Sequence, residues 1–263
     1  VRVIRSAVYR FHALVASPWR LGRLLLAGDA AHQMPPFLGQ GMCAGVRDAA
    51  NLAWRLHSVL EGRAGDGLLD SYETERAPHV RSIIDLAVTM GSIICTLDPE
   101  VAAARNQQFR DHPELAPQGE PGELLPPLGP GVLQQDEHGA VVPPAGTCFI
   151  NPRDDDPFET PLDRRTRGFT VLTRRGAPDW SITWDEDEDD DKDVAGWPPR
   201  LRPGGWSPPF ADAAVDSWLD EHAAAAVILR PDHYVWGIAR SVDELPALVD
   251  QLADQLGAPP RST

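Results

Sequence analysis

The hydrophobic positions of the first sixty residues predict two strands followed by a helix. Residues 8–15 alternate as in a strand with one mainly apolar face. The continuous apolar run Leu24–Ala27, between turn residues, predicts a strand buried on both faces. Apolar residues then recur every three or four positions from Val46 to Leu60, which predicts an amphipathic helix, and Gly62 is a typical helix stop.

The next stretch predicts a second helix and then a linker. From Tyr72 to Ile93, large side chains recur at alternating four- and three-residue steps, which predicts a long packed helix or helix pair. Pro78 is expected to kink or divide it. Between residues 98 and 146 this pattern gives way to proline, glycine and acidic residues, so we predict a surface linker with a short helix near residues 101–109.

The last third of the chain predicts a small α/β domain. Residues 169–173 read as a strand, residues 213–221 as a helix, and residues 226–238 as a hairpin. The capping-box pattern Ser241-x-x-Glu244 then opens a final amphipathic helix. The chain is thus predicted to be α/β, divided into residues 1–98, a linker over residues 99–145, and residues 146–258.

Composition excludes several classes of protein. The 263 residues contain 39 acidic and 24 basic side chains, a net charge of −15, which repels nucleic acid and anionic membrane surfaces. The longest apolar runs are far shorter than the roughly 20 residues that cross a bilayer, so no membrane association is predicted. The three cysteines have neither C-x-x-C nor metal-ligand spacing, which argues against a metal site and predicts a cytoplasmic protein.

An acidic run at residues 185–193, in which eight of nine residues are Asp or Glu, predicts a solvated surface loop. Calcium binding is the alternative, but the run lacks the ordered spacing and the glycine of a calcium loop.

The residues that point to chemistry lie around two glycine-containing turns. A strand that ends at Gly28 lets the backbone approach a ligand, and the carboxylate of Asp29 is an acceptor for which a polyol is one good partner. Gly39 and Gly41 leave unencumbered N–H groups at a helix start, where the helix dipole favours negative charge. This arrangement can hold a ring that accumulates charge.

These residues form an ordered pattern: GRLLLAGDAAH at residues 22–32, PPFLGQG at residues 35–41 and RDAANLAW at residues 47–54. The pattern closely resembles the second flavin-binding motif of the FAD-dependent aromatic hydroxylases, the flavoprotein monooxygenases built like p-hydroxybenzoate hydroxylase. SYETER at residues 71–76 and the tail from residue 217 onward are similar to the 3-(3-hydroxyphenyl)propionate hydroxylases and their phenol-hydroxylase relatives. The resemblance covers nearly the whole chain, although the middle linker and the acidic run match the family only loosely.

The resemblance implies a set of FAD contacts. Asp29 would bind a ribityl hydroxyl, Pro35 and Pro36 would border the isoalloxazine ring, and the backbone of residues 39–43 would face its pyrimidine edge. The residues assigned to FAD in this way are Gly28, Asp29, Pro35, Pro36, Gly39, Gln40, Gly41, Met42 and Cys43.

The implied fold is the C-terminal part of a Rossmann-like flavin-binding domain, followed by a thioredoxin-like α/β domain. The implied reaction is hydroxylation of a phenolic ring with O2 and NAD(P)H as co-substrates, and FAD carries the difficult chemistry.

The sequence departs from the family in two respects. No G-x-G-x-x-G fingerprint for the ADP half of FAD follows a strand, and most of the inserted substrate domain is missing. With its strand-like start at residue 8, the chain reads as the C-terminal half of a hydroxylase, either a fragment or a truncated member. It is expected to form a homodimer or to associate with the missing N-terminal half. Cys43 stands where many relatives carry Asn, so a side-chain amide contact to flavin would be lost.

Other interpretations stay open at this point. A non-catalytic interaction module is the alternative function, and a thioredoxin-like redox protein is disfavoured because C-x-x-C is missing. His32 is better explained as a hydrogen-bonded structural residue than as a general base. Cys43 is expected to be unreactive, and Arg47 and Asp48 to be either a surface pair or an anchor for the loop. No catalytic residue is assigned.

Overall fold

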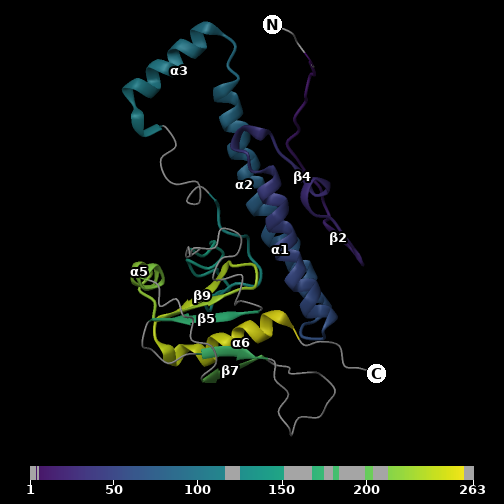
Figure 1. The fold of residues 1–263 in the computed structure, drawn as a ribbon, viewed down its shortest axis with the longest axis vertical. Helices are drawn as coiled ribbons and strands as arrows, with labels where there is room; N and C mark the ends of the chain where they lie inside the picture. The colour runs from purple at the N-terminus through teal and green to yellow at the C-terminus, as the bar shows by residue number, and fades with distance from the viewer. Residues whose placement is uncertain are drawn as a thin grey trace. The chain divides into compact units, whose positions relative to one another are not determined.

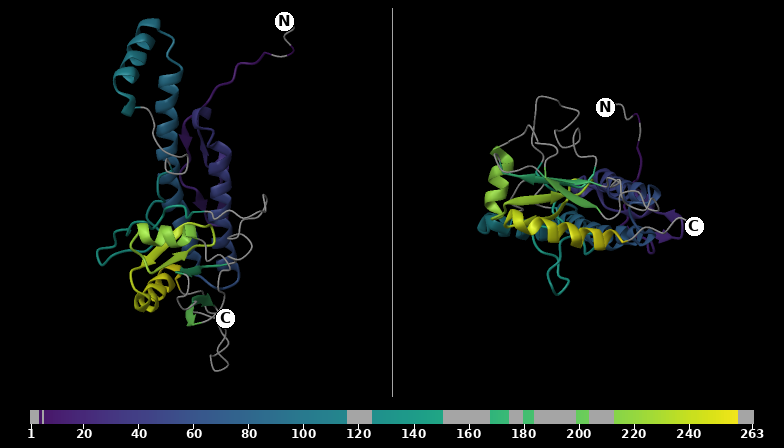
Figure 2. Two further views of the ribbon diagram at one scale, coloured as in Figure 1. Left: turned by 60° about the vertical axis from the view of Figure 1, so that its left-hand side comes forward. Right: turned by 90° about the horizontal axis from the view of Figure 1, so that it is seen from below.

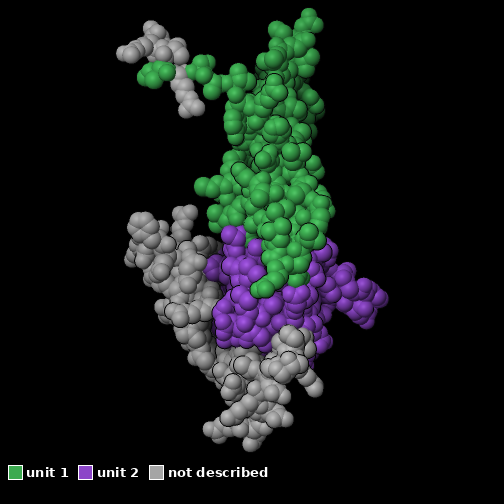
Figure 3. All heavy atoms as spheres, turned by 90° about the vertical axis from the view of Figure 1, so that its right-hand side faces the viewer, with its two compact units in different colours: residues 1–48, 77–126 green, residues 49–76, 127–263 purple. Residues whose placement is uncertain are grey.

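The computed structural model describes residue 4 and residues 6–115, 125–150, 168–174, 180–183, 199–203 and 213–257, drawn as ribbons in Figure 1 and Figure 2. The chain divides into two compact units, coloured separately in Figure 3. Unit 1 contains residues 1–48 and 77–126, and unit 2 contains residues 49–76 and 127–263. The acidic run at residues 185–193 lies outside the described residues.

Short strands and turns form the start of unit 1. Strand β1 pairs antiparallel with β4, and β2 pairs antiparallel with β3. The bounds of these elements are β1 Leu14–Val15, β2 Arg20–Leu21, β3 Leu24–Leu25, the 3-10 turn η1 Gly28–Ala30, β4 His32–Gln33 and the 3-10 turn η2 Pro36–Leu38.

Two strand predictions in this region need correction. The strand predicted over residues 8–15 is formed only at Leu14–Val15, because β4 pairs with these two residues alone. The run Leu24–Ala27 is not buried on both faces: Leu24 is 63 % exposed and the next three residues are half-buried. A strand becomes buried on both faces only when other elements cover them, and no described part of unit 1 covers Leu24.

Helix α1, Gly41–Leu60, shows its apolar stripe to solvent. Val46 and Leu60 are 62 % and 78 % exposed, and Ala49 and Ala53 are exposed as well. The opposite face is buried although it carries charged and polar residues. The periodicity therefore predicts the helix correctly and the buried face incorrectly, because the buried polar side chains have partners elsewhere in the chain.

Helix α2, Ser71–Ile94, runs through Pro78 without dividing. Proline removes one intrahelical hydrogen bond, and the helix retains the buried apolar side chains on either side of it. A 3-10 turn, η3 Asp66–Asp70, precedes α2. Helix α3, Pro99–Asp111, is followed by the 3-10 turn η4 Pro113–Leu115 and confirms the short helix predicted in this stretch.

Unit 2 contains an antiparallel sheet in the order β7-β6-β5-β8-β9. The strand, helix, hairpin and final helix predicted from the sequence are all present, whereas β6 and β7 were not predicted. The bounds are β5 Thr170–Thr173, β6 Trp180–Thr183, β7 Arg200–Pro203, α5 Ala213–Glu221, β8 Ala226–Leu229, β9 Val235–Ala239, η5 Val242–Glu244 and α6 Leu245–Leu256.

The two faces of this sheet are covered by different helices (Figure 2). Val171 and Ile228 pack with Leu252 of α6, on the same side as Trp54 of α1. Leu172 and the other alternate side chains of β8 and β9 pack with α5. This alternation follows from the period-2 geometry of strands and gives unit 2 a layer of helix on each side of the sheet.

Part of the predicted linker belongs to the core of unit 2. Leu128, Leu133 and Ala145 are buried together with Tyr234. The backbone of this segment bonds to β9, for example from the Gln134 N–H to the Trp236 carbonyl at 2.7 Å. A proline- and glycine-rich composition does not exclude such packing when an exposed strand edge is available.

Within the described ranges, no single helix is long and apolar enough to cross a membrane. The stretches Asp66–Ile94 and Pro99–Asp111 meet the criteria of length and composition only as a pair, across a bend of 113°. The described residues also contain no group of three or more His, Cys, Asp or Glu side chains placed to hold a metal ion.

Candidate functional site

The turn at Gly28 lies against helix α1 within unit 1. Gly28 has a positive φ of 57°, which an L side chain rarely adopts, and the turn closes with a 2.8 Å hydrogen bond from the Ala31 N–H to the Gly28 carbonyl. A Cβ atom built on Gly45 would lie 3.4 Å from the Gly28 Cα. The small residue at position 45 thus allows the turn backbone to approach the helix closely.

Asp48 joins this turn to the helix. Its Oδ2 accepts a 3.0 Å hydrogen bond from the Gly28 N–H and lies 2.6 Å from Nε2 of His32. Both side chains are buried. Because an ionised carboxylate only accepts, a hydrogen bond between the two side chains requires the His32 tautomer with its proton on Nε2. Of the two interpretations of Asp48, the loop anchor is therefore correct, and His32 is a hydrogen-bonded structural residue as expected.

Asp29, the next residue in the turn, is exposed. No described residue donates a hydrogen bond to its carboxylate. The anchored turn thus presents an acceptor that is free to bind a ligand hydroxyl.

The second turn leads directly into α1. Pro35 is buried and Pro36 is exposed, and Gly39 has a φ of 63° that closes the 3-10 turn with a 2.9 Å bond to the Pro36 carbonyl. A Cβ on Gly39 would meet no atom within 4 Å, so the space beside it is open.

The first backbone bond at the start of α1 runs from the Ala44 N–H to the Gln40 carbonyl at 2.8 Å. The N–H groups of residues 41–43 therefore lie at the open end of the helix dipole, without intrahelical acceptors. Met42 is 81 % exposed and Cys43 is half-buried.

Arg47 adds positive charge to this loop. Its Nη2 donates a 3.0 Å hydrogen bond to Oε1 of Gln40, and its Nη1 is buried without a hydrogen-bond partner among the described residues. A buried donor without an acceptor is costly, so the orphaned Nη1 indicates a place where a ligand acceptor would be stabilised.

Aromatic rings flank the same loop. The Phe37 ring lies where a side chain on Gly91 of α2 would be, because a Cβ there would come within 2.3 Å of it. Phe11 contacts Phe37 edge to face at 5.9 Å between ring centroids, and Tyr9 contacts Phe11 at 5.0 Å. The glycine on α2 therefore leaves room for the Phe37 ring beside the proline pair.

The sequence-predicted residues are thus assembled in unit 1, with Gly28 and Asp29 on one turn and residues 35–43 on the next. Sequence reasoning did not find the orphaned Nη1 of Arg47, and it left Asp48 between two roles. The signal available for Asp48 was an acidic residue seven positions into a helix on the same face as Gly41, Ala44 and Gly45.

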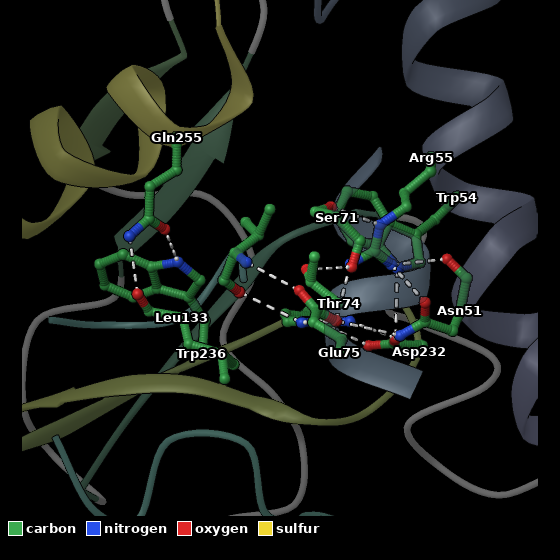
Figure 4. Close-up of polar contacts among 12 residues, drawn as sticks. Asn51, Trp54, Arg55, Ser71, Thr74, Glu75, Leu133, Asp232, Trp236 and Gln255 are labelled. Carbon is green, nitrogen blue, oxygen red and sulfur yellow. Dashed lines mark hydrogen bonds and ion pairs between the residues drawn. The ribbon is translucent and has the colours of Figure 1, made fainter. Parts of the chain in front are cut away.

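Unit 2 holds a separate cluster of buried charges that the sequence did not predict (Figure 4). Glu75 of α2 contacts Arg55 of α1 at 2.7 Å and Arg230 at 2.8 Å, and Arg230 contacts Asp232 at 2.6 Å. All four side chains are fully buried. Two positive and two negative charges make the cluster neutral overall.

Further hydrogen bonds complete this cluster. Oδ2 of Asp232 accepts from Asn51 Nδ2 at 3.0 Å and from Trp54 Nε1 at 3.2 Å, and Oε1 of Glu75 accepts from the Val132 N–H at 2.7 Å. Figure 4 shows the residues converging from α1, α2 and the β8–β9 turn. The cluster thus ties the sheet of unit 2 to the helical segments of the same unit.

The charges in the cluster set one another's pKa values. Burial alone would raise the pKa of Glu75, but the attraction of Arg230 and Arg55 outweighs it and lowers that pKa below its ordinary value. Burial alone would also raise the pKa of Asp232, but the attraction of Arg230 outweighs it and lowers the pKa of that carboxyl. For Arg230, the attraction of both carboxylates outweighs burial and raises the pKa. Glu75, Asp232 and Arg230 are therefore charged at neutral pH. At Arg55, burial outweighs the attraction of Glu75 and lowers the pKa of the guanidinium.

Comparison with known proteins gives a consistent picture. Residues 1–87 match the FAD binding domain family. The chain is 36 % identical to the 3-(3-hydroxy-phenyl)propionate/3-hydroxycinnamic acid hydroxylase of Mycobacterium avium (strain 104), over 99 % of this chain and 48 % of that protein. It is 35 % identical to the probable NADH-specific resorcinol 4-hydroxylase of Rhodococcus jostii (strain RHA1), over 95 % of this chain and 46 % of that protein.

Among solved structures, the rebeccamycin biosynthetic enzyme RebC with reduced flavin superposes with a TM-score of 0.57 at 24 % identity. The match covers 93 % of this chain and 46 % of that one, and it shows likeness of fold alone. The chain spans about half the length of the curated relatives it matches.

Proposed function

We propose that the chain, which is similar in sequence to the FAD-dependent aromatic hydroxylases, carries the ring-facing part of an FAD site. The observation that supports this most directly is the grouping within unit 1 of the Asp29 carboxylate, the open amides of residues 41–43 and the orphaned Nη1 of Arg47. The proposed substrate is a phenolic acid or a dihydroxybenzene, and the proposed electron donor is NAD(P)H.

The residues present fit the cofactor. Asp29 would accept a hydrogen bond from a hydroxyl of the ribityl chain, and Pro35 and Pro36 would border the ring. The amides of Gly41, Met42 and Cys43, with those of Gly39 and Gln40 before them, would face the pyrimidine edge. There the positive end of the α1 dipole and the charge of Arg47 would stabilise negative charge on the ring. When bound, FAD supplies the hydride acceptance and oxygen activation that the side chains themselves do not provide.

The complete activity requires groups outside this chain. The G-x-G-x-x-G fingerprint for the ADP half of FAD is missing from the sequence. The exposed apolar side chains of Leu24, Val46 and Leu60 are the kind of surface that a partner segment buries. We therefore propose that residues 1–98 pair with an N-terminal half, on the same polypeptide or on another chain, in the cytoplasm.

Residues 146–258 are proposed to be a thioredoxin-like domain with a role in assembly, either in a homodimer or with the N-terminal half. The order β5, α5, the β8–β9 hairpin and α6 supports this assignment. Residues 99–145 connect it to the flavin-facing part, and the stretch from residue 127 onward packs into the core of unit 2.

The test of this function is reconstitution. The chain is incubated with FAD, freed of unbound cofactor and assayed for NADH and NADPH oxidation with 3-(3-hydroxyphenyl)propionate and resorcinol, with product detection by mass spectrometry. An N-terminal half from a relative is added in a parallel sample. Retained flavin together with a product 16 mass units heavier, one added oxygen atom, is expected at least in the combined sample. Absence of retained flavin in both samples would contradict the proposal.

A non-catalytic interaction module is the second candidate, and the exposed apolar stripe of α1 favours it. Under this alternative the chain binds its partner equally well with and without FAD, and no hydroxylated product forms. FAD-dependent assembly would distinguish the catalytic proposal from it.

A further inference from the structure

We propose that Asp48 is a positioning residue for the FAD site, which locks the Gly28–Asp29 turn onto helix α1 so that both parts of the site keep a fixed separation. This inference rests on the proposed function. Asp48 is buried and bonded to protein groups, so it acts through the turn and not by contact with the cofactor.

The lock has two components on one face of the helix. Gly45 and Asp48 are three residues apart, so they point in similar directions. Gly45 leaves room for the Gly28 backbone, and Asp48 supplies the acceptor for the Gly28 N–H at 3.0 Å. The next residue after Gly28 is Asp29, the proposed ribityl ligand. Any movement of the turn away from α1 therefore moves Asp29 as well.

A carboxylate suits this role better than a neutral side chain. The same Oδ2 atom receives hydrogen bonds from Gly28 and His32, one on each side of the turn. Hydrogen bonds to a charged acceptor are roughly twice as strong as neutral ones. The turn is thus held at its first residue and again at His32, with Asp29 between the two points.

The other part of the site lies on the same helix. The amides of residues 41–43 belong to the first turn of α1. Arg47, next to Asp48, donates a hydrogen bond to Gln40, the residue that precedes these amides. One rigid helix thus carries the amides directly and the Asp29 turn through Asp48. Since displacements of about 1 Å at a site can change its activity by orders of magnitude, a fixed separation matters for cofactor binding.

The test compares Asp48→Ala and Asp48→Asn with a matched surface variant, Asp85→Asn, on the exposed side of α2. Hydrogen exchange of the complete chain without cofactor is measured at the amides of Gly28 and Ala31, which report the turn. The Ala44 and Ala102 amides, bonded to the Gln40 and Asp98 carbonyls, report α1 and α3 as internal references.

Exchange at Gly28 and Ala31 is expected to accelerate by about tenfold or more in Asp48→Ala, because the Gly28 donor loses its acceptor. Asp48→Asn retains an acceptor oxygen, so its exchange rates at Gly28 and Ala31 are expected to lie between those of Asp48→Ala and those of the unchanged chain. Ala44 and Ala102 are expected to change by less than about twofold in every variant. Unchanged exchange at Gly28 in both Asp48 variants would overturn the inference. So would equal acceleration at all four amides, which would make Asp48 a residue of general stability.

FAD affinity is then measured by fluorescence titration with the same variants. Asp48→Ala is expected to weaken binding by about tenfold or more, and Asp85→Asn to leave it unchanged. If the unchanged chain binds no FAD even with an N-terminal half present, the proposed function fails, whereas the exchange data still decide whether Asp48 locks the turn. If FAD binds and Asp48→Ala binds equally tightly, the inference fails and the proposed function stands.

Discussion

Nη1 of Arg230 lies 2.8 Å from Oε2 of Glu75, although 155 positions separate the two residues in the sequence. The same guanidinium atom also donates to the Val132 carbonyl at 3.1 Å. These contacts join the turn after β8, the start of α2 and the segment after residue 127 at one buried point of unit 2. The stability of unit 2 therefore depends on charges that no local sequence pattern indicates.

Loss of one charge from this cluster is expected to be severe. Glu75→Gln leaves two buried guanidinium groups with one carboxylate, which should lower the free energy of unfolding by about 3–5 kcal/mol. Chemical denaturation followed by tryptophan fluorescence measures this change. Asp220→Asn is the matched control, because the Arg174–Asp220 pair is largely exposed and should contribute about 1 kcal/mol or less. Equal effects of the two substitutions would contradict this account of the cluster.

The lowered pKa values of Glu75 and Asp232 predict a loss of stability in acid. In the unfolded chain both carboxyls titrate near pH 4, and in the folded chain they titrate lower, so the unfolded state binds more protons between these values. Their contribution is present above about pH 4 and is lost as the pH falls through the folded pKa values. Unfolding free energies measured from pH 7 down to pH 3 should show a shallower decline in Glu75→Gln. An identical decline in both proteins would refute this assignment.

Gly91→Ala is expected to disturb the proline loop of unit 1. The added Cβ would approach the Phe37 ring to 2.3 Å, so the ring and its loop must shift, at a cost of about 1–3 kcal/mol. Thermal unfolding and FAD titration measure the two effects. Gly67→Ala is the control, since a Cβ there meets no atom within 4 Å. A Gly91→Ala chain with unchanged stability and FAD affinity would show that Phe37 has no fixed place.

Exposed apolar side chains on unit 1 and α1 predict association. Leu21, Leu24, Met42 and Val46 are each more than 60 % exposed. Exposed apolar surface of this kind is commonly buried by a partner. Sedimentation velocity over a range of concentrations should show self-association, and an added N-terminal half should suppress it. A monodisperse monomer at the highest concentration would contradict this expectation.

The sequence predicts the helices and the last hairpin well because each has local signals. The Ser241-x-x-Glu244 pattern is one example, although it caps the 3-10 turn η5 that leads into α6: the Ser241 hydroxyl accepts from the Asp243 N–H at 3.2 Å, and Glu244 accepts from the Arg240 N–H at 2.8 Å. Periodicity does not predict which face of α1 is buried, because that depends on distant partners. Arg55 is buried with Glu75 opposite it and with further hydrogen bonds to Asn51 and Ser71.

In the candidate site, too, the features with local sequence signals are predicted and those that depend on distant partners are not. The glycines and Asp29 could be found from their order along the chain, since turns with positive φ and helix starts have characteristic residues. The lock through Asp48 could not be assigned, because an Asp at a helix position is equally compatible with an exposed surface. Strands β6 and β7 were missed for a related reason: β6 pairs with β7 across a gap of sixteen residues, so no short turn marks the pair in the sequence.

The central claim is that unit 1 binds the ring-facing part of FAD through Asp29. Equilibrium titration of FAD fluorescence with the chain, its Asp29→Ala variant and the Asp85→Asn control tests this claim most directly. We predict saturable binding by the unchanged chain and by Asp85→Asn, and binding by Asp29→Ala that is weaker by about tenfold, the loss expected for a charged hydrogen bond to a ribityl hydroxyl. Equal affinity of all three proteins, or no binding by any of them with an N-terminal half present, would contradict it.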